Sequence, residues 1–393
     1  MFLRNNRIGL LDLSTGEASE QDLPDESDLE RLSSVSIAAG LLAQHGPDAL
    51  VLGTGILTAS FAPAACAGIL ASSRGVVPVL GFAGVELKLS GFDFIVLKGI
   101  AKEPGYVWIR DGMIELVEAA RLKATDSWAR TDKIRSDQGD SKIHVLAGGP
   151  WSDVSSPAAQ LVIDHWGGED KIGIGAELGL RNLAAIAVRG MGELEIEEPE
   201  SHMEESVLLM REHIEKLGAN EGLASYTSLV DRDDFRGLVH RHVACYGCPF
   251  PCRSFLKINE SPQEFRLVVK EPGYLHYDVP ALETAFSLGL SARDATDILI
   301  RCARACVEPV AALERASLNA SKVTSEVVGS VVTAPGNIPA GAGVANFEAS
   351  FSDSSTYLRC LGMGLCPRYW SRAGFDEEAV SRLWMLAGVS ESR

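Results

Sequence analysis

The stretch Tyr106-Val-Trp-Ile-Arg-Asp-Gly-Met-Ile-Glu-Leu-Val117 decides the character of the first half of this chain. It consists of two largely apolar runs on either side of Asp111 and Gly112, and Asp-Gly between such runs is a strong signal for a β-hairpin. Other β-type runs surround the hairpin, at residues 7–13, 92–98, 142–147 and 184–188. The pattern therefore predicts a β-rich N-terminal domain.

We place this domain at residues 1–195 and expect only one or two helices in it, one of them over residues 28–45 with Asp28 as its N-cap. Residues 191–204 are acidic and contain Pro199, which indicates a linker. The apolar residues that follow recur at helical spacing, over 205–217 and in a pair of stretches over 281–310. Residues 205–393 should therefore form a mainly α-helical domain, and the fold class is α+β.

Composition limits the partners and the compartment. The chain has 393 residues and a formal net charge of −17, which argues against nucleic acid or an anionic membrane surface as a main partner. We find neither a signal peptide nor an apolar stretch near the ~20 residues that a membrane-spanning helix needs. We expect a cytoplasmic protein, in which the eight cysteines are ligands or buried thiols rather than disulfides.

Three cysteines, Cys245, Cys248 and Cys252, follow the pattern C-x2-C-x3-C. The glycine and prolines between them favour a tight turn, which lets three thiolates converge on one inorganic centre. The best candidate for a fourth ligand is Cys366, with Cys360 as a rival. Three interpretations stay open at this point: a [4Fe–4S] cluster, tetrahedral zinc, and thiols that bind no metal.

The other cysteines and the glycine-rich stretch have plainer interpretations. Cys66, Cys302 and Cys306 lie among alanines and are expected to be buried thiols. The segment Gly173-Ile-Gly-Ala-Glu-Leu-Gly179 has one residue too many for a dinucleotide fingerprint. It predicts a close-packed turn that opens a helix, which can still present N–H groups to a ligand phosphate. No residue stands out as catalytic.

Several segments, in conserved order along the chain, resemble the tungsten-containing aldehyde:ferredoxin oxidoreductase family. They are Leu11-Asp-Leu-Ser-Thr-Gly-Glu17, residues 52–63, residues 84–96, residues 171–188, the cysteine loop 244–252 and Gly364-Leu-Cys366. Together they span most of residues 7–300 and a short C-terminal piece. The resemblance is therefore to the whole arrangement of the family and not to one motif.

The resemblance implies a β-rich base for a tungsten–bis-pterin cofactor, with Cys245, Cys248, Cys252 and Cys366 binding one [4Fe–4S] cluster beside it. The pterin would lie against two loops, Thr54–Ala67 and Lys171–Gly179, the latter through Lys171, Gly173 and Gly175. In that family the tungsten site oxidises an aldehyde and the cluster passes electrons to ferredoxin. We accordingly expect a ferredoxin-like carrier or a partner oxidoreductase subunit, in a homo- or hetero-oligomer.

The departures from the family pattern concern the pterin. Cys66 stands where the family has a basic residue, and Leu361 replaces a motif aspartate. Lys171 replaces an arginine, so the compact charge of an ammonium group stands in place of a planar guanidinium fork. The segment between residues 310 and 360 is also shorter than in full-length members. These changes suggest a divergent or shortened paralogue with a degenerate tungstopterin site. The alternative is a non-catalytic, metal-stabilised structural partner of a larger oxidoreductase.

Overall fold

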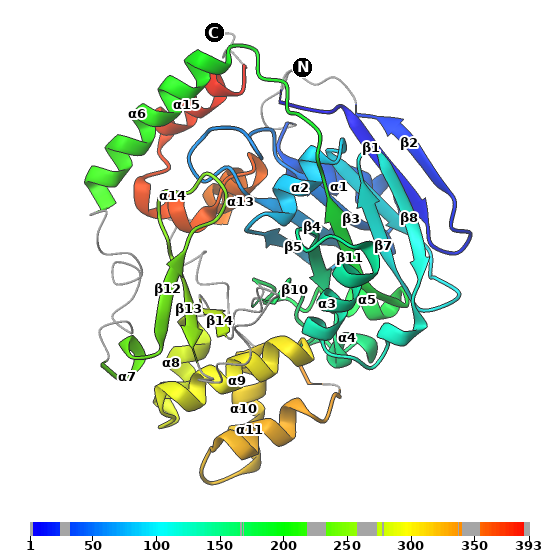
Figure 1. Cartoon of the computed structure of the whole chain (residues 1–393), viewed down its shortest axis with the longest axis vertical. Helices are drawn as coiled ribbons and strands as arrows, with labels where there is room; N and C mark the ends of the chain where they lie inside the picture. Colours follow the sequence, from blue (N-terminus) through cyan, green and yellow to red (C-terminus); the bar gives the residue numbers. More distant parts are fainter. Residues whose placement is uncertain are drawn as a thin grey trace.

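The computed structural model describes most of the chain. The described residues are 3–23, 32–165, 167, 169–217, 233–257, 273–276, 279–336, 338–339 and 354–388, and side chains are not described at 217, 240, 241, 254–257, 273–276 and 279. Figure 1 shows a β-rich body formed by the first half of the chain and a set of helices formed by the second half.

The first half contains two mixed sheets. The six-stranded sheet has the order β2-β1-β6-β3-β4-β5, in which β1 and β6 are parallel and the other neighbours antiparallel. Its strands are β1 (Arg7–Asp12), β2 (Ala18–Asp22), β3 (Leu50–Thr54), β4 (Gly68–Ser72), β5 (Gly75–Val79) and β6 (Phe94–Lys98).

The five-stranded sheet has the order β10-β9-β11-β7-β8, with β11 and β7 parallel. Its strands are β7 (Gly105–Arg110), β8 (Met113–Glu118), β9 (His144–Ala147), β10 (Val162–Ile163) and β11 (Leu183–Arg189). Strand β9 lies between β10 and β11 and is antiparallel to both, so residues 160–190 do not form a Rossmann βαβ unit.

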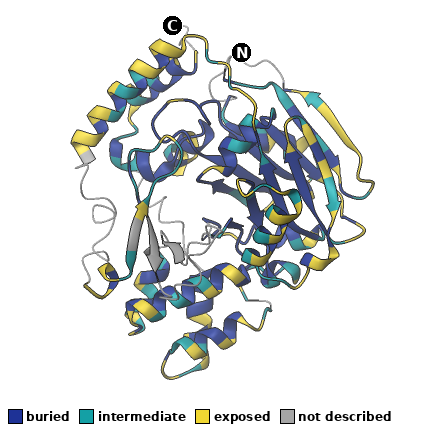
Figure 2. Cartoon of the chain, in the orientation of Figure 1, coloured by how far each residue is buried: buried dark blue, intermediate teal, exposed yellow. Residues whose placement is uncertain are grey.

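The central strands of both sheets are covered on both faces, which explains why strands such as β3, β4 and β11 are continuous apolar runs, whereas the edge strands β2 and β8 are partly exposed. Alternate residues of β6 point to opposite sides, so Ile95 and Leu97 enter the core between the two sheets while Phe94 and Val96 face the helical half. On the second sheet, Tyr106 and Trp108 of β7 enter a third core beneath helix α3 (Ser127–Gln138). The central strands are buried throughout (Figure 2).

The predicted hairpin is confirmed. Strands β7 and β8 pair antiparallel from Gly105 opposite Glu118 to Arg110 opposite Met113. The two turn residues, Asp111 and Gly112, have φ of 40° and 82°, and a two-residue turn with positive φ at both positions suits the twist of the strands.

The prediction of one or two helices in the first half was wrong. The described part of residues 1–195 holds five α-helices, which are α1 (Ser34–His45), α2 (Ala83–Leu89), α3, α4 (Pro150–Asp153) and α5 (Ala176–Leu180). Helix α1 begins at Ser34 with Ser33 as its N-cap, and Asp28 lies outside the described residues. The helices cover sheet faces that would otherwise expose apolar side chains.

The second half is mainly helical, and the fold is α+β. Its helices are α6 (Pro199–Leu217), α7 (Asp233–Arg236), α8 (Val279–Ser287), α9 (Ala292–Ala305), α10 (Pro309–Asn319), α11 (Ser325–Val332), α13 (Ser354–Gly362), α14 (Pro367–Ala373) and α15 (Glu377–Leu386). The break expected near Leu290 separates α8 from α9, where Ser291 accepts a hydrogen bond from the Asp294 N–H as N-cap. Helix α6 begins inside the stretch expected to be a linker, and the domain boundary itself stays a prediction.

One feature of the second half was not expected from its sequence. Strands β12 (Val239–Val243), β13 (Arg253–Lys257) and β14 (Gly273–His276) form a small antiparallel sheet. Within the described residues, no helix has both the length and the apolar character to span a membrane.

Candidate metal centre

The cysteine loop is the connection of a β-hairpin. Strands β12 and β13 pair with Val243 opposite Arg253, so residues 244–252 form the turn between them and carry all three cysteines of the loop. The turn is tight: the Cys248 N–H donates to the Cys245 carbonyl oxygen, and Gly247 has a φ of 60°. The strand pairing therefore fixes the base of the loop that the sequence singled out.

Cys366 reaches the same place from the other end of the chain. It is the residue before helix α14, and Pro367 takes the first helical position, where a missing N–H costs nothing. Gly364, with a φ of 89°, turns the chain between α13 and α14. The Cys366 thiol is buried.

The loop between β3 and β4 joins these two segments. The Ala64 N–H donates to the Gly247 carbonyl oxygen, and the Ala64 carbonyl oxygen accepts from the Cys366 N–H, each at 2.9 Å. The Ala67 N–H donates to the Gly364 carbonyl oxygen at 3.0 Å. Residues 55–67 are thus bonded on one side to the cysteine loop and on the other to the segment that carries Cys366.

This arrangement brings five thiols together, which we call the five-thiol site: Cys66, Cys245, Cys248, Cys252 and Cys366. Cys66 was correctly expected to be buried, but its neighbours were not foreseen, since its thiol hydrogen-bonds with Cys245 and Cys366. The four cysteines predicted as ligands also interact electrostatically with one another.

Two arginines lie near the five-thiol site and favour the thiolate form of Cys245. The hydrogen bond from Cys66 lowers the pKa of Cys245 to about 6. Burial opposes this shift, and the charges of Arg253 and Arg368 add to it. Burial raises the pKa of Cys252 to about 12, although Arg368 acts in the other direction. Arg368 is itself buried and paired with the buried Glu169 at 3.1 Å. Sequence reasoning missed both arginines, although each directly follows or nearly follows a cysteine.

The donor set suits an iron–sulfur cluster. It offers four thiols on two loops, of which those of Cys252 and Cys366 are buried and the other two are half-buried. The buried guanidinium groups of Arg253 and Arg368 lie near them. Among the described residues, no group of three or more His, Cys, Asp or Glu side chains is arranged so that it could hold a single metal ion. Four thiolates around zinc would each lie about 2.3 Å from the metal, and a larger four-iron group separates its ligands more widely.

The remaining cysteines have other hydrogen-bond partners. Cys360 is buried in α13 and donates to the Leu365 carbonyl oxygen at 3.9 Å, and burial together with the nearby Cys366 raises the pKa of Cys360. Cys302 and Cys306 are buried in and after α9, as expected, and the Cys306 thiol donates to the Ala147 carbonyl oxygen.

The second expected cofactor loop is closed upon itself. Asp170, buried beneath the turn, accepts hydrogen bonds from four backbone N–H groups, those of Leu161, Ile172, Ile174 and Gly175, at 2.7–3.1 Å. Gly173 is required by packing, because a Cβ there would lie 1.9 Å from the Pro157 carbonyl oxygen. The stretch is the close-packed turn that we predicted, and α5 follows it directly.

The other residues expected to touch a pterin also have partners inside the chain. The Lys171 ammonium pairs with Glu308 at 2.7 Å, and both side chains are buried. Thr54 donates its hydroxyl to the Asp93 carbonyl oxygen, and the Ala67 N–H is bonded as described above. Leu361, at the expected acidic position, is fully buried in the core.

These observations decide how well a pterin phosphate fits. A buried anion needs cations or N–H donors. Here the N–H groups of the turn are directed at Asp170, and the charge of Lys171 is matched by Glu308. The residues as arranged do not fit a tungstopterin, whereas the five-thiol site fits an iron–sulfur cluster.

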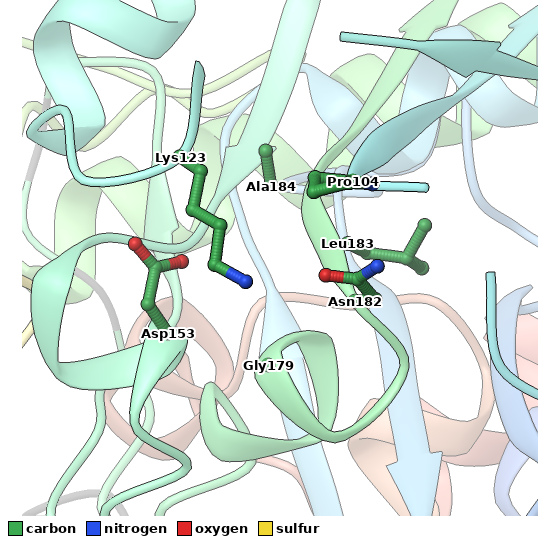
Figure 3. Close-up of a pocket in the computed structure, with 7 residues that line it drawn as sticks. All are labelled: Pro104, Lys123, Asp153, Gly179, Asn182, Leu183 and Ala184. Carbon is green, nitrogen blue, oxygen red and sulfur yellow. The ribbon is translucent and has the colours of Figure 1, made fainter. Parts of the chain in front are cut away.

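A small pocket lies elsewhere, at one end of the five-stranded sheet (Figure 3). The Lys123 side chain points between Asp153 and Asn182. The lining residues are Pro104, Lys123, Asp153, Gly179, Asn182, Leu183 and Ala184. The pocket has room for about one water molecule, so it is not a substrate site.

Comparison with known proteins shows similarity mainly over the first half of the chain. Residues 8–190 match the family model described as aldehyde ferredoxin oxidoreductase, N-terminal domain. A tungsten-containing aldehyde ferredoxin oxidoreductase of Thermococcus kodakarensis is 29% identical over 248 residues, which are 58% of this chain and 39% of that protein. Its counterpart in Pyrococcus furiosus is 28% identical over 249 residues, or 58% and 40%. The match thus spans about two fifths of the length of these relatives.

Two further similarities are more distant. The aliphatic sulfonate oxidoreductase, WOR-like subunit, of Pyrococcus furiosus is 23% identical over 223 residues, which are 46% of this chain and 35% of that protein. The active site complex BamBC of benzoyl coenzyme A reductase, solved with 1,5-dienoyl-CoA, has a TM-score of 0.68 and 15% identity, over 97% of this chain and 64% of that one. The latter shows a shared fold alone. Residues 8–190 therefore correspond to the N-terminal domain of the aldehyde ferredoxin oxidoreductase family, and the chain is similar to tungsten-containing members of that family over 58% of its length.

Proposed function

We propose that this chain is an electron-transfer protein of an oxidoreductase family, with one [4Fe–4S] cluster bound by Cys245, Cys248, Cys252 and Cys366. The observation that carries the proposal is the five-thiol site, where a hairpin loop and the start of α14 meet beside Arg253 and Arg368. A bound cluster would accept and pass on single electrons.

The chain's own residues would set the properties of such a cluster. Burial of Cys252 and Cys366 limits the access of water on their side of the cluster, and the nearby guanidinium groups would stabilise the added negative charge of the reduced state. The bonds from residues 64 and 67 to the two ligand-bearing segments keep those segments in register. These groups would bind the cluster and tune its potential.

We further propose that the chain does not hold a complete tungsten–bis-pterin site on its own. The support comes from the turn around Asp170, whose N–H donors are already used, and from the buried pair of Lys171 with Glu308. A chain of this kind would not oxidise an aldehyde by itself.

Metal analysis of anaerobically purified protein tests both proposals. We expect about four iron atoms per chain, a brown colour, and neither tungsten nor molybdenum in stoichiometric amount. Zinc without iron would overturn the cluster. About one tungsten and two pterins per chain would overturn the second proposal and leave the first intact.

The fourth ligand can be tested with a matched pair of variants. Cys366→Ser should remove most of the iron, while Cys360→Ser should retain it, because Cys360 bonds to a carbonyl oxygen within its own segment. Both thiols are buried, so the pair controls for the loss of a buried sulfur atom. The opposite outcome would assign the fourth ligand to Cys360.

A second candidate function is a metal-stabilised subunit that supports a larger oxidoreductase without its own redox role. Two names favour it, since one relative is called a WOR-like subunit and the structural neighbour is a BamBC complex. The two functions differ in one measurement. A redox subunit should show a reversible EPR signal on reduction with dithionite, and a purely structural one should be unchanged by reductant.

A further inference from the structure

The five-thiol site holds one sulfur more than a four-iron cluster binds. Cys66 belongs to the stretch Ala62-Pro-Ala-Ala-Cys-Ala67, in which its thiol is the single polar side-chain group. The backbone on either side of it is bonded to the cysteine loop through Ala64 and to the turn at Gly364 through Ala67. Cys66 is therefore held between the two segments that carry the proposed ligands, and it is fully buried.

The fifth thiol is oriented toward the ligands and not into the core. Its hydrogen-bond contacts are with Cys245 and Cys366, one on each segment. Cysteines bind an iron–sulfur cluster as thiolates, so in these contacts the S–H of Cys66 is the proton that can be shared and Cys66 is the donor. A protonated thiol beside thiolates is a donor that has no water to compete with it.

We propose that Cys66 is not a ligand but donates an S–H hydrogen bond to the cluster-bound sulfur of Cys245, and thereby raises the reduction potential of the cluster. Reduction adds one negative charge to a group that is already anionic. A hydrogen bond to a ligand sulfur stabilises the reduced form more than the oxidised form. This inference rests on the proposed iron–sulfur cluster.

The test compares the midpoint potentials of three variants by EPR-monitored redox titration of the anaerobically purified full chain. Cys66→Ala removes the donor and should shift the potential to a more negative value while the iron content stays at that of the unaltered protein. Cys66→Ser restores a donor at the same position, and its potential should lie closer to that of the unaltered protein. Cys306→Ala is the control, since it removes a buried thiol that bonds to a backbone oxygen, and it should shift nothing.

Two outcomes would overturn the inference. Equal potentials for Cys66→Ala and the unaltered protein would show that the thiol does not act on the cluster. Loss of iron in Cys66→Ala, with retention of iron in Cys306→Ala, would make Cys66 a ligand. Absence of iron from the unaltered protein would instead refute the proposed function, so the two failures are distinguishable.

Discussion

Asp170→Ala is the substitution whose consequence the structure defines best. The carboxylate is buried and accepts four backbone N–H groups, two on each oxygen atom. Alanine would leave four buried donors without an acceptor. Each such donor costs about 1–3 kcal/mol, so the low end of the range gives a loss of about 4 kcal/mol.

Two effects reduce this figure. Burial raises the pKa of Asp170 although the four N–H groups oppose that rise, so removing the carboxylate also removes the cost of burying a charge. Water can also enter the space that the side chain leaves. We therefore expect the free energy of unfolding to fall by about 2–4 kcal/mol.

The assay is urea unfolding followed by far-UV circular dichroism, with Asp376→Ala as the control. Asp376 is an exposed N-cap that accepts one N–H, from Ala379, and its loss should cost about 1 kcal/mol. Hydrogen exchange of residues 161–175 should accelerate in Asp170→Ala but not in Asp376→Ala. A destabilisation by Asp170→Ala no greater than that of the control would refute the reasoning.

Two further predictions concern buried charges. Lys171→Met should lower the free energy of unfolding by about 3–5 kcal/mol, because it leaves the buried Glu308 without its cation. The double variant with Glu308→Gln keeps the N-cap bond to Ala311 and should recover most of that loss in thermal unfolding. Equal stability of the single and double variants would contradict this. The charges of His144 and Arg135 outweigh burial and lower the pKa of Asp164. In acid, the unfolded chain then binds more protons than the native chain. The stability that Asp164 contributes is therefore present above about pH 4 and is lost as the pH falls further. The Asp164→Asn variant should be less stable at neutral pH, and its free energy of unfolding should depend less on pH in acid.

Two helices, α3 and α2, were not predicted from the sequence although weak signals for them are present. Helix α3 has Asp126 as its N-cap and Gly139 as a left-handed C-cap, and these could have marked its ends. Its interior is polar with few apolar positions, so periodicity gave no sign of it. Helix α2 is short and almost wholly buried, and its apolar run does not distinguish a helix from a strand.

One part of the candidate site could be predicted from the sequence and another part could not. The cysteine spacing in residues 245–252 pointed to a shared inorganic centre because nearby thiolates on a turn can converge whatever the rest of the fold does. The partners of Cys66 could not be predicted, since Cys245 and Cys366 are brought to it by pairing between distant segments. Trp370, just after Cys366, donates its ring N–H to the Pro63 carbonyl oxygen across 307 residues of sequence.

The amino-acid sequence by itself determined the local structures: the hairpin over residues 105–118, the apolar strands, the helical texture of the second half and the cysteine loop. Backbone preferences and the spacing of apolar residues act over a few residues, and they are readable in order along the chain. Tertiary structure alone decided which polar groups meet. Asp170 filling the turn, Lys171 pairing with Glu308 and Cys66 lying against two proposed ligands all follow from the requirement that buried polar groups find partners, and those partners are chosen by packing between segments far apart in sequence.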